Sequence, residues 1–149
     1  MSVKSKREEE YLEAIFILSK RKRRVRVKDL SDMLKVKPSS VVEYLDKLAR
    51  KGFIIYLKRE EVSLTEKGRE IVEKVYMKHV ALKEFLMLLL KVPEEVAEED
   101  ACYIEHGIHD LTISRVLKFI EFVKNYPGGK PEFLKQLEHY YEYGEYLLD

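Results

Sequence analysis

One short segment of the chain gathers three side chains that can bind a metal ion. In ACYIEH, residues 101–106, the only cysteine, Cys102, is followed by Glu105 and His106. Residues at i, i+3 and i+4 of a helix lie on one face, so a thiolate, a carboxylate and an imidazole can converge on one ion. The alternative is a packed cysteine beside solvated polar side chains. The triplet therefore needs ligands from other elements before it predicts a site.

Further side chains with suitable chemistry lie on two other predicted helices. His79 faces inward on a long helix, between Tyr76 and Leu82. Glu10 and Glu13 are neighbours at i and i+3 on the first helix, and neither interrupts its apolar face. A site containing all of them would join the first half of the chain to the second. The candidate ligands are Glu10, Glu13, His79, Cys102, Glu105 and His106.

The amino-acid composition limits the kinds of protein to which these residues can belong. A chain of 149 residues with 46% hydrophobic residues can bury a core as one domain or two small ones. No apolar run approaches the roughly 18 to 20 residues that a membrane helix needs, and the first residues lack an apolar signal region. A single cysteine cannot form an internal disulfide, which fits a reducing compartment. We therefore expect a cytoplasmic protein without a membrane anchor.

The small net charge of +1 conceals an asymmetry. Residues 1–64 carry 17 Lys and Arg against 10 Asp and Glu, a balance of +7, whereas residues 65–149 carry 11 against 17, a balance of −6. A basic first half favours a polyanionic partner, and an acidic second half favours metal ligands or dimer contacts. An uneven but functionless distribution of surface charge is the alternative.

The order of elements in the first half is typical of a winged helix-turn-helix. Apolar residues recur at helical spacing in 8–20, 27–36 and 38–51, and residues 53–65 indicate two short strands around a charged turn. In the short helix, Val27, Leu30, Met33 and Leu34 are expected to face inward. The predicted fold class is therefore mainly α with a small β wing.

The third of these helices, 38–51, is the predicted recognition helix, entering the major groove of DNA near its N-terminus. Lysines and serines at that end can contact phosphates and base edges. Lys47, Arg50, Lys51 and the wing extend the basic surface as phosphate contacts. A chance pattern in an all-helical domain is the alternative. The predicted DNA-contacting residues are Lys35, Lys37, Ser39, Ser40, Glu43, Lys47, Lys58 and Arg59.

The second half is predicted to be helical and dimeric. A long helix runs from Thr65 to Pro93, an acidic helix follows, and 110–125 forms a helix with an apolar face suited to a second copy. A turn-rich break at 126–131 precedes a final tyrosine-rich helix. The expected domains are a DNA-binding domain, 1–72, a metal-binding and dimerisation domain, 73–125, and a helical extension, 126–149.

Taken together, these motifs resemble those of the DtxR/MntR family of metal-dependent, iron- or manganese-responsive transcriptional repressors. The similar segments are YLEAIFIL, KPSSVVEYLDKLARKGFI, VSLTEKG, YMKH and ACYIEH. The resemblance implies a homodimeric repressor that binds a double-stranded DNA operator, an inverted repeat, and controls metal-uptake genes. It implies that one metal site is formed by Glu10, Cys102, Glu105 and His106, and that Glu13 and His79 contribute to a neighbouring site.

Several positions depart from either branch of that family. Glu10 stands where the iron branch typically has Met and the manganese branch Asp, whereas Cys102 matches the cysteine of the iron branch. Lys83 stands where the iron branch has a further carboxylate ligand, and Glu98 where it has histidine. The neighbouring site therefore departs from the family's pattern.

Ligand chemistry favours Fe²⁺ as the cofactor, because a thiolate is softer than Mn²⁺ prefers. Mn²⁺ is the alternative, since Glu10, Glu13 and Glu105 make a carboxylate-rich surrounding. Co²⁺, Ni²⁺ or Zn²⁺ are expected to substitute in vitro. In this hypothesis the ion is a co-repressor that clamps the two halves in a DNA-binding geometry.

Two other classes of function are alternatives to a metal-dependent repressor. The main rival is a winged-helix regulator that senses an organic ligand, or a redox state through Cys102. An enzyme is not expected: EHGIH, residues 105–109, resembles a reversed zinc-protease motif but lacks its order and spacing, and no phosphate-binding glycine loop accompanies it.

Overall fold

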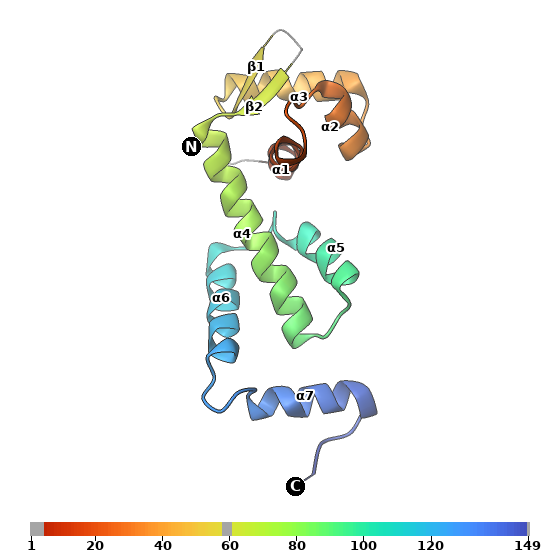
Figure 1. The fold of residues 1–149 in the computed structure, drawn as a ribbon, viewed down its shortest axis with the longest axis vertical. Helices are drawn as coiled ribbons and strands as arrows, with labels where there is room; N and C mark the ends of the chain where they lie inside the picture. The colour runs from red at the N-terminus through yellow and green to blue at the C-terminus, as the bar shows by residue number, and fades with distance from the viewer. Residues whose placement is uncertain (1–4, 58–60, 149) are drawn as a thin grey trace. The chain divides into compact units, whose positions relative to one another are not determined.

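The computed structural model describes residues 5–57 and 61–148 and divides the chain into two compact units, residues 1–77 and 78–149. The predicted mainly α fold with a two-stranded wing is confirmed (Figure 1). The division falls inside one long helix, five residues beyond the domain boundary expected at residue 72, which stays a prediction. Within the described residues, no helix has the length and apolar character needed to cross a membrane.

The first unit contains three helices, a hairpin and the N-terminal half of a longer helix around one core. Its elements are α1 (Lys6–Arg21), α2 (Val27–Leu34), α3 (Pro38–Arg50), β1 (Ile54–Leu57) and β2 (Glu61–Leu64). Each helix contributes apolar residues at helical spacing, so that Tyr11, Leu30 and Leu45 are completely buried. Tyr11 also stacks on Tyr44, with ring centroids 4.7 Å apart, which ties α1 to α3.

Local chemistry sets the limits of α3, the predicted recognition helix. Lys35 adopts a left-handed conformation with φ 54°, which turns the chain after α2. Pro38 occupies the first turn, where its missing N–H costs nothing, and Gly52 ends the helix with φ +80°. The helix-turn-helix order predicted from the sequence is therefore present.

The wing is an antiparallel pair in which Ile54 lies opposite Leu64 and Leu57 opposite Glu61. Val25, in the basic segment between α1 and α2, forms a further bridge to Val62, whose N–H donates to the Val25 carbonyl at 3.0 Å. Lys58 and Arg59, the predicted wing contacts to DNA, lie outside the described residues.

The helix α4 (Glu66–Leu89) begins with a side-chain cap from Thr65. The Thr65 hydroxyl accepts a hydrogen bond from the Gly68 N–H at 3.1 Å and donates one to the Gly52 carbonyl at 2.6 Å. The start of α4 is thereby fixed to the turn that follows α3.

The second unit contains the C-terminal half of α4 followed by α5 (Glu94–Ile104), α6 (Asp110–Lys124) and α7 (Glu132–Tyr143). Ala81 and Phe85 of α4 pack against Val116 and Ile120 of α6. Polar pairs described below join α4 to α5, and the Tyr141 hydroxyl of α7 donates to the Leu89 carbonyl at 3.2 Å.

Three local expectations need correction. Met33 does not face the core but is 37% exposed, because the short helix α2 buries only Leu30 completely. The acidic helix ends at Ile104, with Glu105 as its C-cap in helical conformation, so His106 lies beyond the helix that carries Cys102. The last helix ends at Tyr143, since Gly144 adopts φ +73° and closes it.

Candidate metal centre

Glu105 is the most buried polar group of the second unit, with only 1% of its surface exposed. It follows the last residue of α5 and keeps helical dihedral angles, so its N–H still donates to the Ala101 carbonyl at 2.9 Å. The side chain therefore leaves the end of α5 in a direction fixed by the helix. Burying a carboxylate is unfavourable unless a cation or hydrogen-bond donors accompany it.

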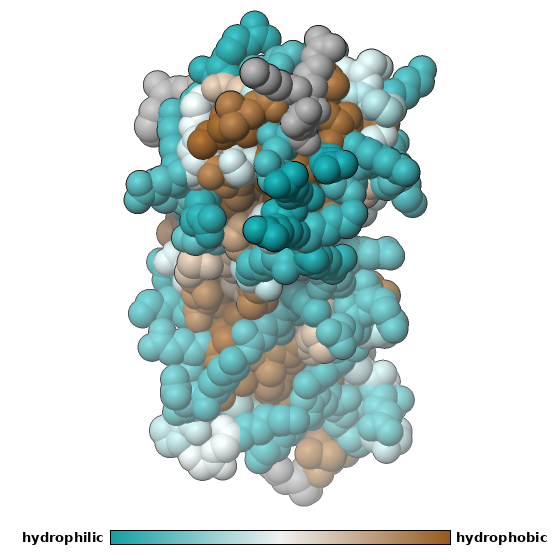
Figure 2. Space-filling model, turned by 45° about the horizontal axis from the view of Figure 1, so that its top comes forward, coloured by the Kyte–Doolittle hydropathy of each residue, from teal (hydrophilic) through white to brown (hydrophobic). Residues whose placement is uncertain are grey.

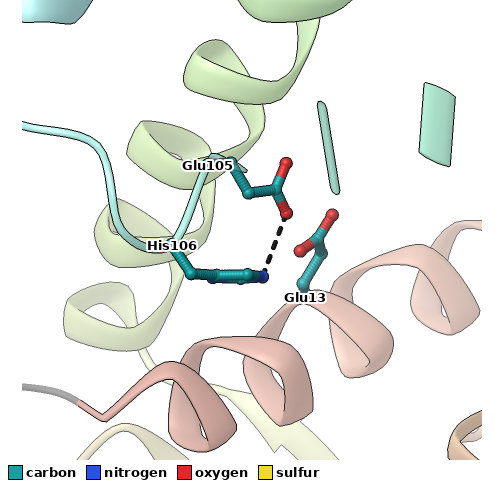
Figure 3. Close-up of side chains that lie close together, drawn as sticks. All are labelled: Glu13, Glu105 and His106. Carbon is teal, nitrogen blue, oxygen red and sulfur yellow. Dashed lines mark ion pairs between the residues drawn. The ribbon is translucent and has the colours of Figure 1, made fainter. Parts of the chain in front are cut away.

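Two imidazoles contact the two oxygens of this carboxylate. His79 Nδ1, on α4, lies 2.7 Å from Glu105 Oε2. His106 Nε2 lies 3.2 Å from Glu105 Oε1, the pair joined by the dashed line in Figure 3. One buried carboxylate thus brings together three residues that sequence analysis selected as metal ligands. Oxygen and nitrogen donors of this kind suit a divalent ion such as Fe²⁺ or Mn²⁺.

A second carboxylate contacts the other nitrogen of the His79 ring. Glu98 Oε1 on α5 lies 2.8 Å from His79 Nε2, and Glu98 Oε2 lies 2.9 Å from Lys83 Nζ on α4. The hydrogen bond from Lys83, followed by that from His79, lowers the pKa of Glu98, although burial opposes the change. Hydrogen bonds to Glu98 and then Glu94 raise the pKa of Lys83.

Sequence reasoning missed this arrangement around His79. It noted Lys83 and Glu98 as departures from a pattern, but not that they would pair with each other. The available signal was the spacing of Glu94 and Glu98, which places two carboxylates on one face of α5.

The remaining predicted ligands are placed on two elements. Cys102 is exposed on the last turn of α5, and among the described residues its sulfur does not form a three-ligand group with Glu105 and His106. Glu10 and Glu13 lie half-buried on α1, where Glu10 accepts a hydrogen bond from Arg7 at 3.2 Å. All three residues remain predicted ligands.

The predicted DNA-contacting residues of the first unit cluster at the exposed side of α3. Ser39, Glu43 and Lys47 follow one another at intervals of four residues and are exposed, so they share one face of the helix. Lys35 and Lys37 are exposed in the turn before it, and Ser40 is half-buried in its first turn. This is the face that a recognition helix presents to a groove.

Lys51, which was expected to contact phosphate, pairs with a buried carboxylate. Its ammonium donates to Glu8 Oε1 at 2.6 Å, and Lys47 Nζ lies 3.3 Å from the same oxygen. Burial of Glu8 on α1 would raise its pKa, but the hydrogen bonds from Lys51 and Lys47 outweigh burial and lower it. Lys51 therefore neutralises a buried carboxylate and joins α1 to α3.

Both units match models of one protein family. The N-terminal DNA binding domain of the iron dependent repressors matches residues 4–62, and their metal binding and dimerisation domain matches residues 65–134. The chain belongs to the iron-dependent repressor family. The resemblance to the DtxR/MntR family is thereby confirmed. Because this family consists of DNA-binding transcriptional regulators, the enzyme alternative is set aside.

Relatives of similar length support the same assignment. An HTH-type transcriptional regulator of Methanocaldococcus jannaschii is 36% identical over 118 residues, which cover 78% of this chain and 94% of the relative. The HTH-type transcriptional regulator MntR of Bacillus subtilis is 31% identical over 135 residues, which cover 89% of this chain and 94% of the relative.

Solved structures of longer family members share the fold. IdeR of T. acidophilum matches with a TM-score of 0.70 and 27% identity, over 89% of this chain and 61% of IdeR. The manganese regulator SloR matches with a TM-score of 0.68 and 27% identity, over 99% of this chain and 64% of SloR. The chain thus spans less than two thirds of the length of these two proteins.

Proposed function

We propose that this protein is a homodimeric repressor whose binding to an operator requires a divalent metal co-repressor, Fe²⁺ or alternatively Mn²⁺. The observation that carries the proposal is the buried Glu105 between two imidazoles, in the domain that matches a metal binding and dimerisation domain. In the proposed site Glu105 supplies oxygen and His106 nitrogen, while Cys102 and Glu10 complete the ligand set. The family resemblance assigns Glu13 and His79 to a neighbouring site.

When bound, the ion supplies positive charge that offsets the carboxylates. The protein's own contribution is to place ligands on α1, which shares a core with the recognition helix. The stacking of Tyr11 on Tyr44 and the hydrogen bond of Lys51 to Glu8 couple α1 to α3 within the first unit. Holding α1 through Glu10 therefore also restrains the helix that reads DNA.

The required coupling is modest. An ion that binds the DNA-competent conformation about 100-fold more tightly than the alternative shifts their equilibrium by roughly 2.7 kcal/mol. We propose that the favoured conformation aligns the two recognition helices of a dimer with successive major grooves of an inverted repeat upstream of metal-uptake genes.

The choice between the ions depends on the donor set. The Cys102 thiolate favours Fe²⁺, whereas three carboxylates favour Mn²⁺, the metal to which SloR responds as a manganese regulator. Both ions are therefore compared in the same experiment.

The proposal is tested by fluorescence anisotropy on promoter DNA under anaerobic conditions at a fixed, stated salt concentration. Chelator, Fe²⁺ and Mn²⁺ are compared for the wild type, Glu10→Ala and Glu105→Gln. We expect the co-repressor to tighten binding at least about tenfold in the wild type and to lose this effect in both variants.

Glu9→Ala, adjacent on α1, is the matched control and should respond to metal as the wild type does. DNA binding that is equally tight in chelator and in both metals would contradict the proposal. It would favour a regulator that senses an organic ligand or a redox state.

A further inference from the structure

The acidic helix α5 presents two carboxylates side by side to α4. Glu94 and Glu98 are four residues apart, and like charges at this spacing repel each other. Lys83 of α4 places its ammonium between them, with Nζ 2.9 Å from Glu94 Oε1 and 2.9 Å from Glu98 Oε2. An ammonium has three N–H donors, and these contacts use two of them.

The second oxygen of Glu98 also has a partner. It lies 2.8 Å from His79 Nε2, while His79 Nδ1 lies 2.7 Å from Glu105. Each nitrogen of the His79 ring therefore faces a carboxylate oxygen. A metal ion could bind His79 only by displacing Glu98 or Glu105 from it.

A metal ion at Nε2 would also meet a positive charge that is already in place. The carboxylate it would share with His79 is Glu98, whose other oxygen holds the Lys83 ammonium. Two cations on one carboxylate repel each other strongly, because the separation is only a few ångströms. The lysine side chain is covalently part of α4, so it does not dissociate as an ion does.

We infer that Lys83 is a built-in cation that takes the place of a second metal ion beside His79. The inference rests on the proposed function, and it deepens it by setting the number of ions at one per subunit. In this arrangement Glu98 holds His79, and His79 in turn holds Glu105. The metal response then depends on a single binding step at Glu105 and His106.

The test counts bound Mn²⁺ by equilibrium dialysis and atomic absorption for folded protein, with circular dichroism as the check on folding. Lys83→Glu removes the ammonium and adds a carboxylate beside Glu94, Glu98 and His79. We expect this variant to bind one more Mn²⁺ per subunit than the wild type. Lys91→Glu is the charge-matched control in the same unit, since Lys91 pairs with Glu138 instead, and it should leave the count unchanged.

Glu98→Gln keeps the test decisive if Lys83→Glu fails to fold. We expect the wild-type count in this variant, because Glu98 binds no ion in the wild type. A count that falls by one would overturn the inference. So would a folded Lys83→Glu protein with the wild-type count.

Failure of the inference and failure of the proposed function give different results. Two ions bound per wild-type subunit would overturn the role of Lys83 and leave metal co-repression intact. If the wild type bound no ion and Lys83→Glu bound one, the role of Lys83 would stand while the proposed co-repressor would not.

Discussion

At the scale of single residues, the polar side chains of the second unit are ordered around Glu105. One oxygen of its buried carboxylate contacts His79 and the other contacts His106. His79 also contacts Glu98, which in turn pairs with Lys83. A buried charge persists only where such partners surround it. Each of these predicted ligands is therefore held by a neighbour, which would reduce the reorganisation required for metal binding.

The residue-scale prediction concerns Cys102, whose exposed thiol distinguishes an iron-type donor set from one with only oxygen and nitrogen. Titration of the protein with Co²⁺ under anaerobic conditions should produce a near-ultraviolet thiolate-to-cobalt charge-transfer band. Because no other cysteine is present, Cys102→Ser should lose this band but retain visible Co²⁺ absorption from the remaining ligands. An unchanged ultraviolet band would show that Cys102 is not a ligand.

At the scale of elements, two junctions control how the helices are held. The first is the start of α4, where the Thr65 hydroxyl bonds both Gly68 and Gly52. The second is the docking of α7, which depends on Glu138 and on the buried Leu134. Both junctions connect segments that sequence periodicity treats as separate.

Gly68 is required because the backbone of Phe53 approaches α4 there. A β-carbon at Gly68 would lie 2.0 Å from the Phe53 carbonyl oxygen, closer than any tolerated contact. Alanine in a helix is ordinarily better than glycine by about 1 kcal/mol. We nevertheless expect Gly68→Ala to lower the free energy of unfolding of the first unit by about 1–3 kcal/mol.

Urea denaturation of the metal-free protein, followed by circular dichroism, measures this change. Gly107→Ala is the control, because nothing lies within 4 Å of its new β-carbon and its φ is not in the left-handed region. Equal stability of Gly68→Ala and the wild type would refute the close approach.

The docking of α7 should depend on pH through Glu138. Lys130 Nζ lies 2.6 Å and Lys91 Nζ 2.5 Å from its oxygens, and hydrogen bonds from Lys130 and then Lys91 lower the pKa of Glu138 below its ordinary 4.5. A carboxyl group whose pKa is lower in the folded state stabilises that state fully above the unfolded pKa. This contribution is lost as the pH falls through the folded pKa.

Hydrogen exchange, corrected for intrinsic rates, should therefore show weaker protection of α7 amides as the pH falls below 4.5. Glu138→Gln should show the loss already at pH 7, by roughly 2–5-fold in protection, the size expected of partly exposed ion pairs. Glu145→Gln, exposed beyond the end of α7, serves as the control. Identical protection in Glu138→Gln and the wild type would exclude this role.

At the scale of the whole molecule, the second unit leaves apolar side chains of α6 uncovered. Leu111, Leu117 and Phe122 of α6 are 69%, 45% and 53% exposed, whereas Val116 and Ile120 of the same helix are buried. Figure 2 shows apolar residues, in brown, at the surface of the protein among hydrophilic residues in teal. Exposed apolar residues on a domain matched as a dimerisation domain are where a second copy is expected to pack.

Leu117→Glu should accordingly weaken the homodimer. Removing a leucine from a buried contact costs about 1.5–3 kcal/mol, which corresponds to a roughly tenfold or greater rise in the dimer dissociation constant. Sedimentation equilibrium measures that constant, and Thr112→Glu introduces the same charge at an exposed polar position of the same helix. A wild-type dissociation constant in Leu117→Glu would place the interface elsewhere.

The sequence by itself determined the order of the helices, the wing and the selection of ligand types. Apolar periodicity, Pro38 and Gly52 are local signals, and they located α1, α3 and the hairpin. His79, Glu105 and His106 were selected from the sequence as candidate ligands, because each combines a ligand side chain with an inward or clustered position. Local patterns were also sufficient for the mainly α fold class.

Only the tertiary structure decided which charged residues pair with one another. Lys51 and Lys83 look like ordinary surface lysines in the sequence, yet one neutralises the buried Glu8 and the other separates Glu94 from Glu98. Their partners lie on different helices, and periodicity along one helix carries no information about the partner across an interface. The cost of burying a carboxylate selects these pairs, and that cost exists only once the helices have packed.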